Sequence, residues 1–152
     1  MRTVALLPIL ACLSTVAWGK VFSRCELARL LQRGGLDGFM GYSLDNWICL
    51  AFYGSRFDTG TVTENSDGSS DYGIFQINSR RWCTDHHSHT LDLCQTRCLD
   101  LLTADLIDDI NCVKKVVMDW EGMGAWYGEN HLISVYLFVC LSIHHHHLHS
   151  WL

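Results

Sequence analysis

Asp71-Tyr-Gly-Ile-Phe-Gln-Ile-Asn-Ser-Arg80 is the stretch of this chain that decides its fold. Its aromatic and β-branched residues, from Tyr72 to Ile77, are typical of a strand. The chain before it, from Asp58 onward, is rich in Thr, Asn, Ser, Asp and Gly, and Asn65-Ser-Asp-Gly68 has the composition of a turn. We therefore predict a small antiparallel sheet in this part of the chain.

Two helices are predicted before this sheet. Residues 25–33 place three leucines on one helical face, and Gly34-Gly35 ends this helix. The three leucines are Leu27, Leu30 and Leu31. A second helix is expected to begin near Ser43, whose hydroxyl can cap it, and to end near Gly54.

A helical period returns after the sheet. Beyond Cys98 apolar residues recur at helical spacing: Leu99, Leu102, Leu106, Ile110, Val113 and Val117. The chain is therefore predicted to be an α+β protein, with a mostly helical domain and a small antiparallel β lobe. Two lobes of this kind leave a cleft between them, and polar chemistry is expected in that cleft.

Residues 1–19 have the pattern of a secretory signal peptide. Arg2 is followed by an apolar run from Val4 to Val16 and by the small-residue sequence Ala17-Trp18-Gly19, after which cleavage is expected. An uncleaved membrane anchor is less favoured, because the run is short and no basic stop-transfer cluster follows it. Cleavage would leave 133 of the 152 residues, the size of one domain, secreted from the cell or held in a secretory vesicle.

Seven cysteines remain once Cys12 is removed with the signal peptide: Cys25, Cys49, Cys83, Cys94, Cys98, Cys112 and Cys140. In an oxidising compartment this number indicates a disulfide framework with one thiol left over. A zinc site at Cys94 and Cys98 is the alternative interpretation. Export and the lack of a second close Cys or His pair argue against zinc.

The charge balance excludes some partners. Loss of Arg2 lowers the eleven Lys and Arg to ten, against sixteen Asp and Glu, so the mature chain carries a net charge of −6 with neutral histidines. Nucleic acids and anionic bacterial surfaces are therefore poor partners on charge alone. The apolar part of residues 132–152 is too short to predict a membrane span. The histidines of this tail, like His86, His87 and His89, are interpreted as solvated rather than metal-binding.

Four parts of the chain resemble a known family, the C-type lysozymes and α-lactalbumins. In chain order they are Lys20-Val-Phe-Ser-Arg-Cys-Glu-Leu-Ala-Arg29, the stretch from Asp71 to Arg80, Cys83, and Gly122-Met-Gly-Ala-Trp126. The spacing of twenty-two residues from Cys49 to Asp71 makes the resemblance specific. It implies a lysozyme-like domain over residues 20–131, followed by a divergent, apolar and His-rich tail over residues 132–152.

The resemblance implies where the catalytic groups of a lysozyme would lie. Lysozymes hydrolyse the β-1,4 linkage of peptidoglycan with one protonated and one ionised carboxyl group, a division of labour taken here from the family. Asp71 matches the ionised carboxylate. The acid is expected five residues after Cys49, but the chain reads Cys49-Leu-Ala-Phe-Tyr-Gly54-Ser55, and glycine has no proton to give. Glu64 is the nearest other carboxyl in sequence, but it belongs to the polar sheet segment, so we do not expect it to replace the acid.

The resemblance also implies a sugar-binding surface. Five residues match cleft positions of the family: Asn65, Gln76, Asn78, Trp82 and Trp126. Aromatic faces and amide groups suit sugar rings. The alternative is that Trp82 and Trp126 are packed in the core, as is expected for Trp47. Arg81 stands where bacteriolytic members have a cleft tryptophan, which is expected to weaken stacking.

An acidic segment resembles the calcium loop of α-lactalbumin and of some lysozymes, which needs hard oxygen ligands. Five residues fall at its ligand positions: Asp100, Thr103, Asp105, Asp108 and Asp109. Thr103 replaces an expected aspartate, so the affinity of this candidate calcium site should be low. The alternative is an acidic first turn that the helix dipole favours. No cofactor is required for the hydrolysis itself.

Two disulfides are implied by the resemblance: Cys83 with Cys98, and Cys94 with Cys112. The family's C-terminal cysteines are not matched, because only Cys140 follows Trp126. Cys49 has therefore lost its expected partner, and Cys25 can at best reach Cys140. Loss of a native disulfide typically lowers the stability of a small secreted domain by about 2 to 5 kcal/mol.

Three functions follow from these observations. The favoured one is a secreted monomer that binds β-1,4-linked amino-sugar glycans, such as peptidoglycan or chitin-like oligosaccharides, with weak or no hydrolysis. Gly54 and the acidic charge favour it. The second is an active peptidoglycan hydrolase, which Asp71 and the cleft residues favour, so enzymatic activity stays undecided. The third is a regulatory subunit in the manner of α-lactalbumin, which a galactosyltransferase pull-down would test.

Overall fold

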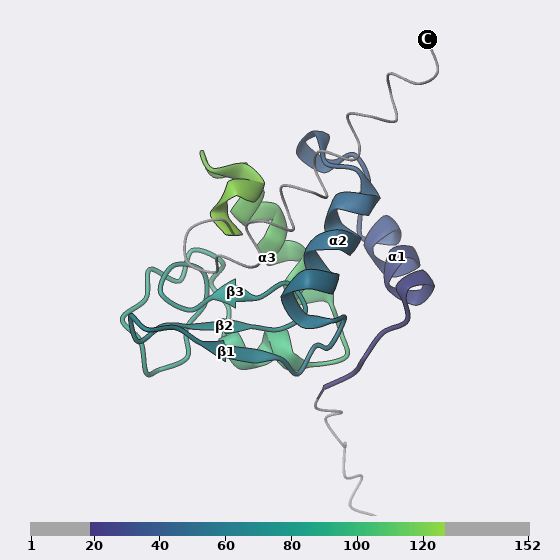
Figure 1. Ribbon diagram of the computed structural model, residues 1–152. Helices are drawn as coiled ribbons and strands as arrows, with labels where there is room; N and C mark the ends of the chain where they lie inside the picture. Colours follow the sequence, from purple (N-terminus) through teal and green to yellow (C-terminus); the bar gives the residue numbers. More distant parts are fainter. Residues whose placement is uncertain (1–18, 127–152) are drawn as a thin grey trace, which may run out of the picture.

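The computed structural model describes residues 19–126 (Figure 1). The predicted signal peptide, the tail, Cys12 and Cys140 lie outside the described residues, apart from Gly19. The structure contains three α-helices, α1 (Arg24–Arg33), α2 (Leu44–Ser55) and α3 (Ile107–Met118). Short 3-10 helices occur at η1 (Phe39–Gly41), η2 (Cys98–Leu102) and η3 (Gly122–Trp126).

The first two helices are close to their predicted bounds. Ser23 caps α1 by accepting a hydrogen bond from the backbone of Glu26 at 3.2 Å, and Gly34 follows its last turn. Leu27 and Leu31 are fully buried on one face of α1, as their spacing predicted. Ser43 precedes α2, where its backbone N–H donates to the Asn46 side chain at 2.9 Å.

The predicted sheet forms as the antiparallel order β1-β2-β3, with β1 (Val62–Glu64), β2 (Ser70–Tyr72) and β3 (Ile77–Asn78). The prediction of one strand from Tyr72 to Ile77 is wrong, because residues 73–76 form the turn between β2 and β3. Gly73 has a φ of 78°, and a Cβ there would collide with the carbonyl oxygen of Leu101. This turn pairs Asp71 with Asn78 across the sheet.

The helical period after Cys98 covers two elements rather than one. η2 ends at Leu102, and α3 begins only at Ile107. Ile110, Val113 and Val117 are buried on α3, whereas Leu99 is 48% exposed on η2. A mostly helical part and a small sheet thus lie side by side, which is the α+β arrangement that the sequence predicted (Figure 1).

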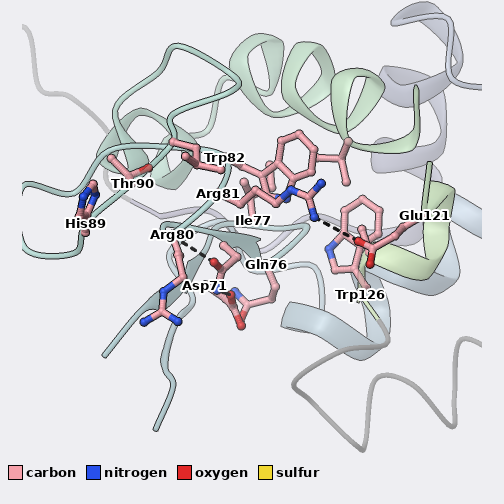
Figure 2. Close-up of a pocket in the computed structure, with 14 residues that line it drawn as sticks. Asp71, Gln76, Ile77, Arg80, Arg81, Trp82, His89, Thr90, Glu121 and Trp126 are labelled. Carbon is pink, nitrogen blue, oxygen red and sulfur yellow. Dashed lines mark hydrogen bonds and ion pairs between the residues drawn. The ribbon is translucent and has the colours of Figure 1, made fainter. Parts of the chain in front are cut away.

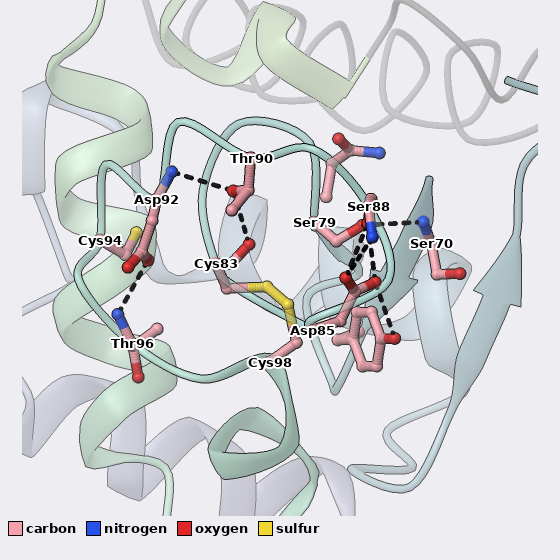
Figure 3. Close-up of a disulfide and its surroundings, with 12 residues drawn as sticks. Ser70, Ser79, Cys83, Asp85, Ser88, Thr90, Asp92, Cys94, Thr96 and Cys98 are labelled. Atoms are coloured by element: carbon pink, nitrogen blue, oxygen red, sulfur yellow. Dashed lines mark hydrogen bonds between the residues drawn. A yellow bond between two sulfur atoms is a disulfide. The ribbon is translucent and has the colours of Figure 1, made fainter. Parts of the chain in front are cut away.

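Two disulfides attach the long loop after β3 to the helices: Cys83–Cys98, which Figure 3 shows, and Cys94–Cys112. The predicted pairing of Cys25 with Cys140 is not formed, because Cys25 carries a free thiol that faces solvent on α1. Cys49, on α2, is disulfide-bonded instead. Thus Cys49 is the cysteine that keeps a partner, contrary to expectation.

The core lies between the helices and the sheet. Trp47 is fully buried there, as predicted, with edge-on contacts to the rings of Tyr42 and Phe75. Within residues 19–126, no helix is both long and apolar enough to cross a membrane. The core therefore fixes α2 against the turn that follows β2, and this contact positions the site described next.

Candidate functional site

A cavity of about 650 Å³ opens between the sheet and the corner where α3 leads into η3 (Figure 2). Its lining comes from three parts of the chain. The sheet and its turn provide Asp71, Gln76, Ile77 and Asn78; the loop after β3 provides Arg80, Arg81, Trp82, His89, Thr90 and Leu91; the helical side provides Val116, Glu121, Ala125 and Trp126. Most of the predicted site residues therefore come together around one cavity.

Asp71 is held at the sheet side of this cavity. Its side chain is 7% exposed, and its Oδ1 accepts a hydrogen bond from Asn78 Nδ2 at 2.8 Å. Asn78 Nδ2 also lies 3.0 Å from the hydroxyl oxygen of Ser69, to which the Asn65 amide donates at 3.1 Å. Asn65 does not line the cavity, but it is connected through Ser69 to the amide that orients Asp71.

Gly54 lies next to the Gln76 side chain, in the last turn of α2. A Cβ at position 54 would be 3.2 Å from Gln76 Cγ and 3.9 Å from the carbonyl oxygen of Ile74. Gln76 lines the cavity, so a side chain at position 54 would contact a residue of the cavity wall. The Gln76 amide is fully engaged: Nε2 donates to Gly73 and Thr61 carbonyls at 2.9 and 3.2 Å, and Oε1 accepts from Thr63 Oγ1 at 2.6 Å.

The two predicted tryptophans are both packed and exposed to the cavity. Trp82 is 6% exposed and Trp126 is 9% exposed, and each contributes to the lining. Trp126 Nε1 donates to the carbonyl oxygen of Phe75 at 2.8 Å, which fixes its ring against the turn after β2. Both tryptophans are therefore packed in the core and also form part of the cavity wall.

Two acidic residues near the cavity were not identified from the sequence. Arg81 forms ion pairs with Asp119 and, at 3.3 Å, with Glu121 (Figure 2). Its guanidinium also lies 5.2 Å from the centre of the Trp82 ring. No motif marks Asp119 or Glu121, because their role depends on Arg81, which is about forty residues away in sequence.

A hydrogen-bond network around Asp85 lies next to the sheet (Figure 3). Asp85 accepts from the backbone N–H groups of His87 and Ser88 at 3.0 and 2.8 Å, from the Ser88 hydroxyl at 2.8 Å and from Tyr72 at 3.2 Å. Burial alone would raise the pKa of Asp85, but these donors hold it well below its usual range. Burial and the Asp85 charge raise the pKa of Tyr72. The sequence contained no signal for this network.

The candidate calcium residues are only partly assembled. Thr103 Oγ1 lies 3.3 Å from the carbonyl oxygen of Asp100 and 3.1 Å from that of Asp105. The backbone carbonyls that these two aspartates could offer to calcium therefore both lie beside Thr103. The Asp100 carboxylate is engaged by Arg97. Asp108 lies exposed in the first turn of α3. In the described part of the chain, no three His, Cys, Asp or Glu side chains converge as a metal site would need.

Asp109 differs from the other acidic residues of this segment in its burial. Its carboxyl group is fully buried, and neither oxygen has a hydrogen-bond partner among the described residues. Burial raises its pKa well above the usual range, and the charges of Asp108 and Asp105 raise it further. A buried carboxyl without donors is costly, so this residue needs a proton or a cation.

The comparisons with known proteins agree with this geometry. The chain is 50% identical over 127 residues to lysozyme C II of Oncorhynchus mykiss, covering 83% of this chain and 85% of the relative. It is 50% identical over 118 residues to lysozyme-like protein 6 of Mus musculus, covering 78% and 80%. The crystal structure of apo-type canine milk lysozyme matches with a TM-score of 0.69 at 51% identity, covering 70% of this chain and 84% of that one. Residues 20–141 match the family model of that group, and the chain thus belongs to the C-type lysozyme/alpha-lactalbumin family.

Proposed function

We propose that this protein binds β-1,4-linked amino-sugar glycans in the cavity beside Asp71 and hydrolyses them weakly or not at all. The observation that carries the proposal is Gly54. A carboxyl group at this position would project toward Gln76 and the cavity, and glycine supplies none. The rest of the wall, including the hydrogen-bonded pair Asp71 and Asn78, is retained.

The lining suits a sugar. The two indole rings, Trp82 and Trp126, offer apolar faces to a sugar ring, and the Asn78 amide and the Asp71 carboxylate offer polar partners. The cavity of about 650 Å³ lies within the ordinary range of small-molecule sites. These features support binding without requiring a proton donor.

No other carboxyl group of the described chain is well placed to replace the missing acid. Glu64 is exposed at the end of β1 and does not line the cavity. Glu121 does line it, but its carboxylate already accepts from Arg81 at 3.3 Å. General acid catalysis typically contributes about 10²- to 10⁴-fold in rate, so its loss should leave little turnover.

The test combines binding and turnover in three proteins. The unmodified chain should bind chitin oligosaccharides in isothermal titration calorimetry and release no reducing ends from peptidoglycan. Gly54→Glu should gain peptidoglycan hydrolysis with an acidic pH optimum, because a carboxyl group in a partly apolar site stays protonated to higher pH. Gly54→Gln is the matched control, with a similar volume and no acidic proton, and should bind but stay inactive.

The space at position 54 makes this test feasible. The new Cβ would approach Gln76 Cγ to 3.2 Å, so the Gln76 side chain must shift by a few tenths of an ångström. Glycine within a helix is less favourable than most residues by up to about 1 kcal/mol, which offsets part of that strain. Both variants carry the same strain, so their difference isolates the proton.

The contrary outcomes select the other functions. If the unmodified chain hydrolyses peptidoglycan at ordinary lysozyme rates, it is an active hydrolase and the proposal is wrong. If it binds no chitin oligosaccharide but is retained by a galactosyltransferase, a regulatory role in the manner of α-lactalbumin replaces it. A folded Gly54→Glu variant that binds sugars and stays inactive would contradict the claim that only the acid is missing.

Secretion is part of the same proposal. It rests on the signal-peptide pattern of residues 1–19 and on the two disulfides, Cys83–Cys98 and Cys94–Cys112, which persist in oxidising compartments. Expression of the full chain in animal cells should yield medium-borne protein that begins at Lys20, as N-terminal sequencing would show. Retention in the membrane fraction would contradict it.

We also propose a weak calcium site at the loop before α3. The buried, unpartnered carboxyl group of Asp109 and the converging carbonyls of Asp100 and Asp105 are the hard oxygen donors that calcium prefers. We expect a low affinity, because Thr103 replaces one negative ligand and Asp108 lies exposed in the first turn of α3. Calcium at millimolar concentration should raise the melting temperature relative to EGTA, and Asp108→Ala should abolish the shift while Asp45→Ala keeps it. An unchanged melting temperature would remove the site.

A further inference from the structure

Arg81 connects two walls of the cavity. It belongs to the loop after β3, and its two partners, Asp119 and Glu121, belong to the corner between α3 and η3. Arg81 and Glu121 both line the cavity, and Figure 2 shows their ion pair reaching from one wall to the other. A ligand that extends along the cavity at this point meets the ion pair rather than open space.

Both ends of this connection are fixed. The carbonyl oxygen of Arg81 accepts from the backbone N–H of Leu93 at 3.0 Å, within the loop that the two disulfides hold. On the other side, Asp119 N–H donates to the Val116 carbonyl at 3.1 Å, and Asp119 Oδ1 accepts from Trp120 N–H at 2.9 Å. The three charged side chains are about one-third exposed or less, so solvent screens their attraction only in part.

Arg81 also lies over the ring of Trp82. Its guanidinium lies 5.2 Å from the centre of the Trp82 ring, in the range of a cation–π contact. A sugar ring stacked on that part of Trp82 would have to displace the guanidinium and separate it from two carboxylates. A shorter oligosaccharide that stays beside Asp71 and Trp126 would not.

We propose that Arg81, through Asp119 and Glu121, determines the length of oligosaccharide that this cavity accepts. The inference rests on the proposed function, because it concerns the same glycan site. We expect the ion pairs to obstruct the cavity beside Trp82, so neutral β-1,4-linked N-acetylglucosamine chains gain no affinity once they reach Arg81. Longer oligosaccharides would bind only if the ion pairs break, and the free energy needed to break them would lower their affinity.

The experiment measures affinities for chitin oligosaccharides from the disaccharide to the hexasaccharide by isothermal titration calorimetry. In the unmodified chain, affinity should stop rising at a short length. In Arg81→Gln, and in the double variant Asp119→Asn with Glu121→Gln, it should keep rising, by about three- to tenfold for the longest chains, as expected when a partly exposed ion pair no longer has to break. The shortest ligand that binds should have the same affinity in all proteins.

A control and a second readout separate this effect from general changes in charge. Arg97→Gln removes an arginine that pairs with Asp100 away from the cavity, and it should leave the length dependence unchanged. High salt weakens partly exposed ion pairs, so it should improve binding of long chains to the unmodified chain and not to Arg81→Gln.

The outcomes distinguish the two proposals. If short oligosaccharides bind and the length dependence is the same in the unmodified chain and both variants, the role of Arg81 is wrong and the glycan-binding function stands. If no oligosaccharide binds to any of the folded proteins, the glycan-binding function is wrong and the role of Arg81 falls with it. Circular dichroism of each variant verifies that it is folded.

Discussion

The sheet side and the helical side of this molecule differ in how their carboxyl groups are hydrogen-bonded. On the sheet side, Asp71 accepts from Asn78, and Asp85 accepts from four donors. On the helical side, position 54 is a glycine, and Asp109 is buried without a hydrogen-bond partner among the described residues. The hydrogen-bonded carboxylates of this comparison therefore belong to the sheet and its loop.

This difference has a physical basis. A carboxylate in the sheet region is surrounded by backbone N–H groups and hydroxyls that the short strands and turns leave available. The interior of a helix uses its N–H groups for its own hydrogen bonds, so a carboxyl group on its buried face depends on whatever packs against it. A glycine at position 54 thus leaves no hydrogen-bond donor without a partner there, whereas replacement of Asp85 would leave several donors unpaired.

The largest effect is expected from removing Asp71 after the acid has been restored. In the Gly54→Glu background, Asp71→Asn should lower the gained peptidoglycan hydrolysis by about two orders of magnitude or more, because both carboxyl groups are then needed. The measurement is the initial rate of reducing-end release. Glu64→Gln in the same background is the control and should retain the activity, since Glu64 is exposed on β1 and does not line the cavity.

Two results would break the comparison at this point. If Asp71→Asn retains the gained hydrolysis, the sheet side does not supply the ionised carboxylate. If Glu64→Gln abolishes it, the partner carboxyl lies on β1 rather than at Asp71. Either result would show that the hydrogen-bonded framework around Asp71 is structural only.

The sequence predicted most of the positions on the sheet side, and for a clear reason. Asp71, Gln76 and Asn78 lie within one short stretch, so a local motif identifies all of them, and the structure brings them to one cavity. Asn65 matched the same pattern, yet it only supports the site through Ser69. Position in a motif predicted proximity to the site better than it predicted contact with the cavity.

The helical side was less predictable, because its contacts join residues that are distant in the sequence. Arg81 meets Asp119 and Glu121 only when the loop after β3 lies against the end of α3.

The turn after β2 was predicted as a strand, because Tyr72 to Ile77 has the composition of a strand. Gly73 and Gln76 have the positive φ angles that make it a turn, and such angles leave little trace in composition. Long-range pairing and local backbone geometry are what the pattern could not supply.

The second effect, on stability, is expected at Asp85. Asp85→Ala should lower the free energy of unfolding by about 2 to 4 kcal/mol, because hydrogen bonds to a charged group contribute about 1.5 to 3 kcal/mol each and are not additive. Urea unfolding monitored by fluorescence measures it. Asp45→Ala, which removes a carboxylate that is 77% exposed on α2, should change stability by less than about 0.5 kcal/mol. Equal effects of the two substitutions would contradict the role given to this network.

The smallest effect, at Asp109, concerns the direction in which stability changes with pH. In the unfolded chain an aspartate has a pKa of about 3.9. Burial raises the folded-state pKa of Asp109 above that value, so between the two the folded protein holds a proton that the unfolded chain has lost. The free energy of unfolding should therefore fall as the pH rises from about 4 toward the folded-state pKa. Asp85 has the opposite shift, so its contribution is lost as the pH falls below about 4.

Asp109→Asn separates these two slopes. The amide does not titrate, so the variant should lose the decline above pH 4 and become more stable than the parent at pH 7, by about 1 kcal/mol. Asp85→Asn should instead flatten the acid limb below pH 4 and leave the upper limb unchanged. Urea unfolding from pH 3 to 8 in EGTA measures both limbs, and EGTA is essential because calcium at Asp109 would replace the proton and conceal the decline. A parent-like profile in Asp109→Asn would mean that the buried carboxyl group on α3 has a partner, and the contrast between the two sides of the molecule would then be limited to position 54.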